Sequence, residues 1–473
     1  MGLADLKDLI EGLENSISLK NGSVQILDRS RLNKTVHALA EVSALERGPR
    51  QGWARYLARK TAAACGIYPA SIQALYMARG RGEIPPTFSV PAINLRALSY
   101  DAARAVIRAA KRINANAFIF ELARSEMGYT DQRPSEYATN VLVAAIEEDY
   151  SGPIFIQGDH FQVSQKRYSS DPEKEVKAIR ELISEAIAAG FFNIDVDTST
   201  LVDLSKPTIH EQQELNTGLS AMFTSFIRSI EPEGVTISVG GEIGEVGGHN
   251  STEEELRVYM DGYNNQLAKL NPGVKGLSKI SVQTGTSHGG VILPDGSIAQ
   301  VNVDFNTLRH LSQIARDAYG LAGAVQHGAS TLPEDAFGKF VEFQACEVHL
   351  ATNFQNMLFD RLPDDLRNEM YAYLDEKYAH ERKAGMTDEQ FYYKTRKNVI
   401  GPFKSQLWNL PTDKKAEIRL AWEQQFDKLF DSLNIVDTRK YVEQTVKPIH
   451  IEPSVKDYLG EDLKVGDISD LAD

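Results

Sequence analysis

Three histidines stand at the ends of short apolar segments, where their side chains could meet around a cation. His160, His288 and His327 are three of the ten histidines in the chain, and each lies beside a glycine or an aspartate. A histidine that only satisfies its hydrogen bonds in a core would be expected inside a strand or a helix. Neutral imidazoles on three different strands can converge on one divalent cation and leave a position open for a substrate oxygen. The pattern therefore predicts a metal site held by these histidines.

Carboxylates accompany the same kind of segment. Asp159 precedes His160, while Asp195, Asp197 and Glu242 end two further apolar runs. Glu242 can complete the shell of a cation, which as a Lewis acid polarises a carbonyl and stabilises an enediolate. Asp159 is adjacent to a predicted ligand and can act as a general acid/base on a substrate hydroxyl. We expect Zn²⁺ or another divalent cation such as cobalt, iron or manganese, and leave open a second structural or monovalent cation.

Short β-rich runs alternate with longer amphipathic helices in the part of the chain that must position these side chains. Such alternation is typical of βαβ units with a parallel sheet, and right-handed crossovers close eight units into a barrel. The predicted strands are 89–95, 116–123, 153–159, 193–199, 235–244, 279–287, 322–329 and 347–352. The predicted fold class is α/β, a (β/α)₈ TIM barrel with additional N-terminal and C-terminal helical segments. The active site of such a barrel forms where its strands end, which is where the candidate residues lie.

Helical periodicity outside the strands divides the chain into three regions. We predict a helical N-terminal extension over residues 1–88, the catalytic barrel over 89–355, and a C-terminal helical region with an acidic tail over 356–473. From Arg47 to Gly82 there is no acidic residue, and the basic ones are Arg47, Arg50, Arg55, Arg59, Lys60, Arg79 and Arg81. We interpret them as a solvated or subunit-contacting helical face rather than a dedicated anion site. The long helical ends indicate a homo-oligomer, most simply a homodimer.

Glycine-rich loops flank two of the predicted ligands. The segments 285–290 (GTSHGG) and 327–331 (HGAST) each place backbone N–H groups within reach of an anion. Late loops of barrels often bind phosphate in this way, although tight turns are the other interpretation of these glycines. The segment 240–248 (GGEIGEVGG) lacks the GxGxxG spacing of a dinucleotide fingerprint, so a mobile active-site loop is the better prediction.

Composition limits the partners and the compartment. A formal net charge of −14 gives no support to nucleic-acid binding. No apolar run approaches the length of about 18 residues that a membrane span needs, and the N-terminus has no apolar signal-peptide core. Cys65 and Cys346 have no metal-type spacing and are expected to be buried free thiols. We therefore expect a cytoplasmic protein without nucleic-acid or membrane partners.

Four motifs resemble, in order and spacing, those of class II fructose-bisphosphate and tagatose-bisphosphate aldolases. They are 157–160 (QGDH), 241–248 (GEIGEVGG), 284–290 (TGTSHGG) and 325–330 (VQHGAS). The resemblance extends over residues 89–355, and 428–437 (KLFDSLNIVD) is similar to the closing helix of the family. It implies a lyase that cleaves or forms a ketose phosphate or bisphosphate through a metal-stabilised enediolate. The implied partner is a phosphorylated sugar, split into dihydroxyacetone phosphate and an aldehyde.

The resemblance also implies roles for single residues. His160, His288 and His327 match the zinc ligands, and Glu242 matches a glutamate that binds a metal in some members. Asp159 matches the aspartate that moves a proton on the hydroxyl of the aldehyde half. The positions that match substrate-binding or phosphate-binding residues are Asn94, Gly289, Gly328, Ser330, His349 and Thr352.

Departures from the family pattern keep two alternatives open. His249 and Asn250 occupy the place of a loop glutamate that moves a substrate proton, and a rearranged loop would be needed for Glu253, Glu254 or Glu255 to replace it. His349 stands where the family has a substrate-binding asparagine, and the phosphate-clamping arginine has no clear counterpart in 404–415. The alternatives are a metal-dependent sugar-phosphate epimerase and a non-catalytic aldolase-like subunit. Asp159 and the three histidines argue against the second.

Overall fold

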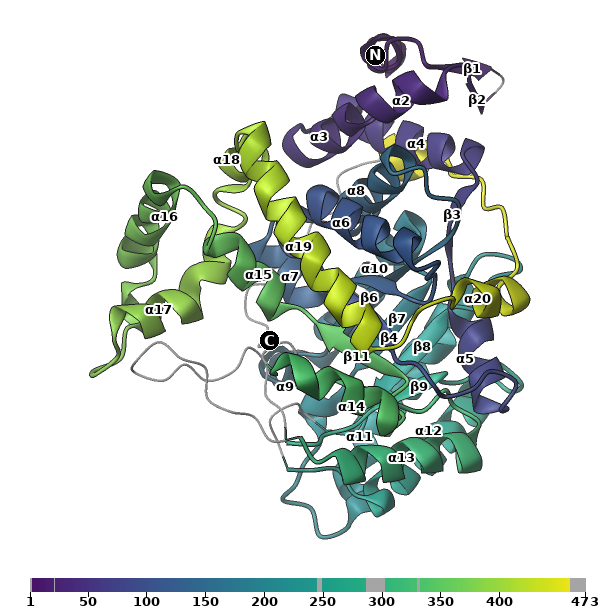
Figure 1. Cartoon of the computed structure of the whole chain (residues 1–473). Helices are drawn as coiled ribbons and strands as arrows, with labels where there is room; N and C mark the ends of the chain where they lie inside the picture. Colours follow the sequence, from purple (N-terminus) through teal and green to yellow (C-terminus); the bar gives the residue numbers. More distant parts are fainter. Residues whose placement is uncertain (1, 21, 245–248, 286–302, 330–331, 460–473) are drawn as a thin grey trace.

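Eight parallel strands close into a barrel, as the alternation of the sequence predicts (Figure 1). The computed structural model describes residues 2–20, 22–244, 249–285, 303–329 and 332–459. The barrel strands are β4 (Val90–Asn94), β5 (Ile119–Ala123), β6 (Gly152–Gln162), β7 (Asn193–Asp197), β8 (Ser238–Glu242), β9 (Lys279–Ser281), β10 (Ala324–Gln326) and β11 (Glu347–Leu350). Each pairs in parallel with the next, and β11 pairs with β4. Seven of the eight predicted runs contain one of these strands and the remaining run, 153–159, lies within β6, so the fold class is confirmed.

Helices follow the strands and cover the outside of the barrel. They are α6 (Ser99–Arg112), α7 (Arg124–Tyr129), α8 (Pro134–Glu147), α9 (Gln165–Ser170), α10 (Pro172–Ala189), α11 (Ile209–Ile230), α12 (Glu253–Leu270), α13 (Phe305–Tyr319), α14 (Phe337–Glu342) and α15 (Thr352–Phe359). Five of them, α9 to α13, begin after a side chain that accepts a free backbone N–H group. Thr208 and Thr252 each form a capping box with a glutamate three residues later, and Asp171 caps α10. The caps fix the length of the loops that carry the candidate residues.

The N-terminal extension adds a strand that helical periodicity does not predict. Its helices are α1 (Gly2–Gly12), α2 (Arg29–Thr35), α3 (His37–Leu45), α4 (Pro49–Ala64) and α5 (Gln73–Gly80), and its strands are β1 (Ile17–Lys20), β2 (Ser23–Ile26) and β3 (Ile67–Ala70). β3 pairs with the first half of β6, and β7 pairs with the second half. Asn193 joins the two by donating to the Ala70 carbonyl (3.2 Å) and accepting from the Ile72 N–H (2.8 Å). One strand of the extension, β3, therefore joins the barrel sheet beside β6.

Three basic residues of the extension are buried rather than solvated. Arg59, Lys60 and Arg79 are each less than a tenth exposed, so the interpretation of a solvated face is wrong for them. Arg79 donates to the carbonyls of Phe88 (2.5 Å) and Ala345 (3.2 Å), which lie just before β4 and β11. Burial lowers the pKa of Arg79 to about 10, which leaves it charged at neutral pH. The distribution of charged residues in the sequence does not predict that a guanidinium group donates hydrogen bonds to carbonyls at the starts of strands.

The C-terminal region packs against the outside of the barrel. It contains α16 (Asp364–Lys377), α17 (Asp388–Thr395), α18 (Lys404–Trp408), α19 (Thr412–Ser432), α20 (Arg439–Thr445) and α21 (Val455–Leu459). α19 runs along α6, where Arg112 pairs with Asp427 at 2.6 Å (Figure 1). The buried Trp422 donates from Nε1 to the Phe354 carbonyl at 3.0 Å. Among the described helices, none combines the length and apolar character that crossing a membrane requires.

Candidate metal centre

An irregularity in β6 brings two successive side chains to the same end of the barrel. The register between β6 and β7 shifts between Gly158 and Phe161, and His160 has a φ of 39°. Asp159 and His160 would face opposite sides of a regular strand, whereas a bulge re-aims a side chain. A Cβ on Gly158 would lie 2.4 Å from the Phe161 ring, so glycine is required beneath this bulge. A positive φ in a residue other than glycine is typical of functional sites.

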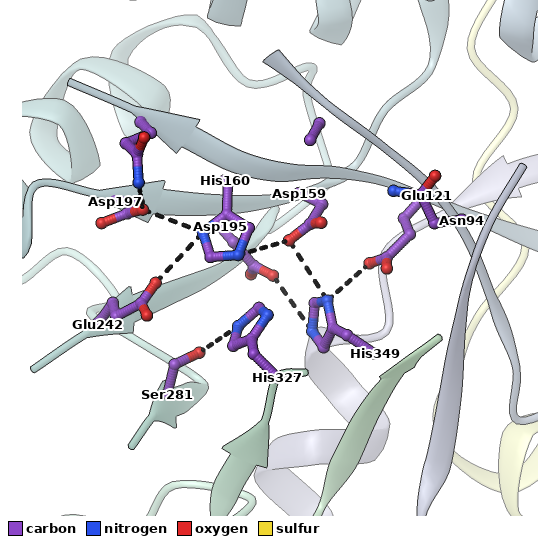
Figure 2. A network of polar contacts seen from close by, with 12 residues as sticks. Asn94, Glu121, Asp159, His160, Asp195, Asp197, Glu242, Ser281, His327 and His349 are labelled. Carbon is purple, nitrogen blue, oxygen red and sulfur yellow. Dashed lines mark hydrogen bonds and ion pairs between the residues drawn. The ribbon is translucent and has the colours of Figure 1, made fainter. Parts of the chain in front are cut away.

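Three imidazoles gather where the strands end. His160 comes from β6, His327 follows β10 and His349 lies in β11, and all three rings point into one space (Figure 2). The ring centroids of His160 and His327 are 4.4 Å apart, and those of His327 and His349 are 4.0 Å apart. The structure thus brings together two of the predicted ligands with a third histidine that was expected to contact substrate. His288, Gly289 and Ser330 lie outside the described residues.

The ligand atoms at this end of the barrel form three groups that could each hold a cation. The groups are His160 with Glu242 and His327, Asp159 with His327 and His349, and Asp195 with Glu347 and His349; within each, the ligand atoms lie within 4.8 Å of one another. Lys279 already occupies the third group. Its Nζ lies 2.9 Å from Asp195 Oδ1, donates to Gln157 Oε1 at 2.7 Å, and pairs with Glu347. A divalent cation therefore fits the first two groups, which share His327.

Hydrogen bonds orient the predicted ligand His160. Its Nδ1 lies 3.0 Å from Asp197 Oδ2, and Asp197 accepts further bonds from Gln162 and Ser199. When Nδ1–H donates to Asp197, the lone pair of Nε2 faces Asp159, whose Oδ1 is 3.8 Å away. A carboxylate partner on one nitrogen commonly fixes the ring of a metal-binding histidine. His160 therefore has the support that a ligand requires.

Buried carboxylates outnumber the permanent cations around these rings. We call this set the mouth carboxylates: Glu121, Asp159, Asp195, Asp197, Glu242 and Glu347, each less than a tenth exposed. In the described part of the chain, Lys279 is the one lysine or arginine that pairs with them. Burial together with Asp159 raises the pKa of Glu121 to about 8, and burial together with Asp197 raises that of Glu242 to about 7. These shifts show that added positive charge would be stabilised here.

The same buried carboxylates favour the protonated, charged form of the neighbouring imidazoles. Burial disfavours the imidazolium of His160, but Asp159, Glu242 and Asp197 outweigh it and raise the pKa well above 6.5. Burial likewise opposes protonation of His349, and Glu121 and Asp159 outweigh it. A proton or a metal ion can supply the charge that these carboxylates favour. Imidazole nitrogens with carboxylate oxygens are suitable ligands for Zn²⁺ and its neighbours, so the donor set fits a divalent cation.

The other predicted contacts lie around this centre with varied exposure. Asn94 is buried at the end of β4 and donates from Nδ2 to Glu126 Oε2 at 2.5 Å. Gly328 follows His327 with a φ of 69°, in the left-handed region that favours glycine. Thr352 is buried as the first residue of α15. These positions surround the end of the barrel from which a substrate could approach.

The acidic residues considered as replacements for the loop glutamate are in the first turn of α12. Glu255 accepts the N–H and the hydroxyl of Thr252 in a capping box, and its other oxygen lies 2.7 Å from His249 Nε2. Glu253 pairs with Arg257 and His310. Both carboxylates are therefore engaged away from the imidazoles in this arrangement of the loop.

Sequence reasoning missed the charged residues inside the strands. Glu121 lies in β5, and Lys279 and Glu347 begin β9 and β11. A charged side chain within an apolar strand was the signal that could have identified them, because burial of a charge requires a partner. Tyr76 of α5 was also missed. Its hydroxyl donates to Glu347 from the side of the N-terminal extension.

Comparison with known proteins identifies one family. Residues 86–406 match the family model described as fructose-bisphosphate aldolase class-II. A fructose-bisphosphate aldolase from Campylobacter jejuni has 15% sequence identity to the chain, covers 79% of it and 97% of its own length, and gives a TM-score of 0.47. The YdjI aldolase from Escherichia coli K12 has 12% identity, covers 78% of this chain and 98% of its own, and gives a TM-score of 0.46. No curated protein matches the chain at a significant level.

Proposed function

The chain belongs to the class II fructose-bisphosphate aldolase family, and on this premise we propose that it is a metal-dependent lyase for a ketose phosphate or bisphosphate. Cleavage would give dihydroxyacetone phosphate and an aldehyde, and the reverse reaction would join them. The observation that carries this proposal is the convergence of His160, His327, Asp159 and Glu242 where the barrel strands end. This is the end of a TIM barrel at which chemistry takes place.

His160, His327 and Glu242 would hold the cation, together with the sequence-predicted ligand His288. When bound, the cation supplies Lewis-acid polarisation of the substrate carbonyl. Imidazole ligands favour zinc, and the same donors accept cobalt, iron or manganese. Asp197 and Ser281 keep the rings in place, since Ser281 Oγ lies 3.0 Å from His327 Nε2.

Asp159 would move the proton on the substrate hydroxyl. Its carboxylate is 6% exposed, and Oδ1 lies 3.8 Å from His160 Nε2 and 3.3 Å from His349 Nδ1. In cleavage it accepts the hydroxyl proton of the aldehyde half, and in synthesis it returns that proton. Substrate and phosphate contacts are assigned to Asn94, Gly328 and Thr352 among the described residues, and to Gly289 and Ser330 from the sequence resemblance alone.

Release of dihydroxyacetone phosphate tests the proposal. The purified protein is incubated with fructose 1,6-bisphosphate, tagatose 1,6-bisphosphate and fructose 1-phosphate, with and without a chelator. The expected result is release from at least one sugar that chelation abolishes and added zinc restores, with the rates ranking the sugars. Release that is unaffected by complete removal of metal would contradict the proposal.

A metal-dependent sugar-phosphate epimerase is the second candidate. It is favoured by the engagement of Glu255 in the α12 cap, which keeps this candidate replacement for the family's loop glutamate away from the imidazoles of the described residues. Epimerisation requires proton transfer next to a carbonyl and no bond cleavage between carbons. No release of dihydroxyacetone phosphate, combined with solvent deuterium entering a ketose phosphate, would favour this candidate.

A further inference from the structure

His349 lies against the candidate metal ligands and is almost completely enclosed. Its side chain is 5% exposed, and its ring centroid is 4.0 Å from that of His327. A residue that contacts the substrate would be expected to keep a polar edge toward the space the substrate enters. His349 instead has both of its nitrogens among buried carboxylates (Figure 2). The two nitrogens of the ring therefore face different carboxylates.

The Nε2 side of His349 is fixed by an anion. Nε2 lies 2.8 Å from Glu347 Oε1, and Glu347 pairs with Lys279 and accepts the Tyr76 hydroxyl. Lys279 also forms an ion pair with Asp195 on this side of the ring. With Glu347 held as an anion, a proton on Nε2 is favoured by the nearby carboxylate. A cation ligand on this nitrogen would have to displace the lysine.

The Nδ1 side of His349 faces carboxylate oxygens across a short gap. Nδ1 lies 3.0 Å from Glu121 Oε2 and 3.3 Å from Asp159 Oδ1. When Nε2 carries the only ring proton, Nδ1 presents a lone pair to two oxygens that also carry lone pairs. This arrangement is unfavourable unless positive charge lies between them, and either a proton or a metal ion on Nδ1 can supply that charge. The Asp159, His327 and His349 ligand atoms are within 4.8 Å of one another, close enough for one cation with bonds of about 2.0–2.2 Å to join them.

We propose that His349 is a direct ligand of the catalytic cation through Nδ1, in the position where the resemblance predicts a substrate-binding amide. The inference rests on the proposed function only for the presence of the cation. Glu347 is then a positioning residue that fixes the ring, and Tyr76 and Lys279 fix Glu347. The ligand set would add His349 to His327, with Asp159 beside them as the general acid/base, and would be richer in imidazole than the sequence motifs imply.

Cobalt binding tests the proposal without any substrate. The affinity for Co²⁺ is measured by competition with a chelator, and the visible absorption of the bound ion reports its ligands. His349→Asn is expected to weaken Co²⁺ binding by at least about 100-fold and to change the visible bands, because losing even an outer partner of a ligand costs about 10- to 100-fold. The matched control is His310→Asn, since His310 is 59% exposed and pairs with Glu253 on the surface. It should bind cobalt like the wild type.

A second variant covers the case in which His349→Asn does not fold. His349→Cys places a thiol at the same position, and a thiolate that binds Co²⁺ gives an intense near-ultraviolet charge-transfer band. We expect this band in His349→Cys and its absence in wild type and in His310→Cys. Unchanged cobalt affinity and spectrum in folded His349→Asn, or no charge-transfer band in cobalt-loaded His349→Cys, would overturn the proposal. Absence of aldolase turnover with both expected cobalt results would overturn the proposed function and leave this inference standing.

Discussion

The two ends of the barrel handle buried charge in different ways. Inside the barrel and where its strands end, the mouth carboxylates and three imidazoles contact mainly one another, and several have pKa values far from their ordinary range. Where the strands begin, Arg79 and Ser89 donate to backbone carbonyls, including that of Ala345 at 3.2 and 2.7 Å. The first end keeps charge available for a cation, while the second satisfies groups that folding has buried. Changes at the first should alter chemistry, and changes at the second should alter stability.

The largest loss of activity is expected from a histidine shared by two ligand groups. His327→Ala should remove the metal and reduce turnover by roughly 10³-fold or more, because Lewis-acid stabilisation supplies several kcal/mol and about 1.4 kcal/mol corresponds to tenfold. Metal content and turnover are measured on the same sample. A variant that retained metal and activity would show that His327 is not a ligand. Unfolding of the metal-free variant would show that this end of the barrel also determines stability.

Asp159→Asn should separate proton transfer from metal binding. We expect the metal to remain bound and turnover to fall by about 10²- to 10⁴-fold, as for the loss of a general acid/base. The measurement is kcat alongside metal stoichiometry. Wild-type turnover would exclude Asp159 from the mechanism, whereas loss of the metal would make it chiefly a ligand.

At the opposite end of the barrel, Arg79→Met should lower the free energy of unfolding and leave kcat nearly unchanged. The substitution leaves the Phe88 carbonyl without its donor and the Ala345 carbonyl with Ser89 alone, which should cost about 2 kcal/mol of unfolding free energy. The midpoint of thermal unfolding should fall, while kcat per folded molecule at low temperature should stay near that of the wild type. Arg81→Met is the control, because Arg81 is 54% exposed and pairs with the exposed Glu83. An equal loss of stability in both variants would refute the role assigned to Arg79.

The smallest predicted effect is a pH dependence that Glu242 contributes. Its pKa in the folded, metal-free protein is raised from 4.5 to about 7, first by burial and then by Asp197. The stability that the protonated group contributes is therefore fully present below about 4.5 and is lost as pH rises through about 7. Metal binding needs the deprotonated form, so affinity should rise about tenfold per pH unit below 7 from this group.

Glu242→Gln provides the comparison for that pH dependence. The variant should bind metal more weakly and release one proton fewer per cation, as measured by titration calorimetry in buffers of different ionisation enthalpy. His160 also titrates, so some pH dependence should remain. The same proton release in wild type and variant would show that Glu242 is not coupled to the cation.

The sequence was sufficient to predict the barrel because its signals are local. Each strand is a short apolar run between helices, and parallel connections leave few ways to arrange eight such units. β3 was missed because it has four residues, one of them Pro69, and its pairing with β6 depends on the closed sheet. Its position follows from contacts distant in sequence that no local pattern encodes.

The candidate site was predictable to the extent that its residues stand at strand ends. Asp159, His160, Glu242 and His327 were identified in that way, and the structure places them together. The bulge that turns His160 toward the others depends on the register between β6 and β7, which the order of residues does not specify. The contacts of Lys279 and Glu347 depend on barrel closure, which makes side chains from separate strands neighbours.

The contact between Tyr76 and Glu347 also has a consequence for biosynthesis. The two residues are 271 positions apart, and Arg79 is 266 positions from Ala345. The ribosome produces α5 early, but Tyr76 does not meet Glu347, and Arg79 has only the nearby Phe88 carbonyl, until β11 has been made. Contacts between residues so far apart in sequence slow folding and leave apolar surface exposed in the meantime. A segment that is synthesised early is therefore among the last to find its final partners, and a nascent chain shorter than 347 residues lacks part of the structure beneath the candidate metal ligands.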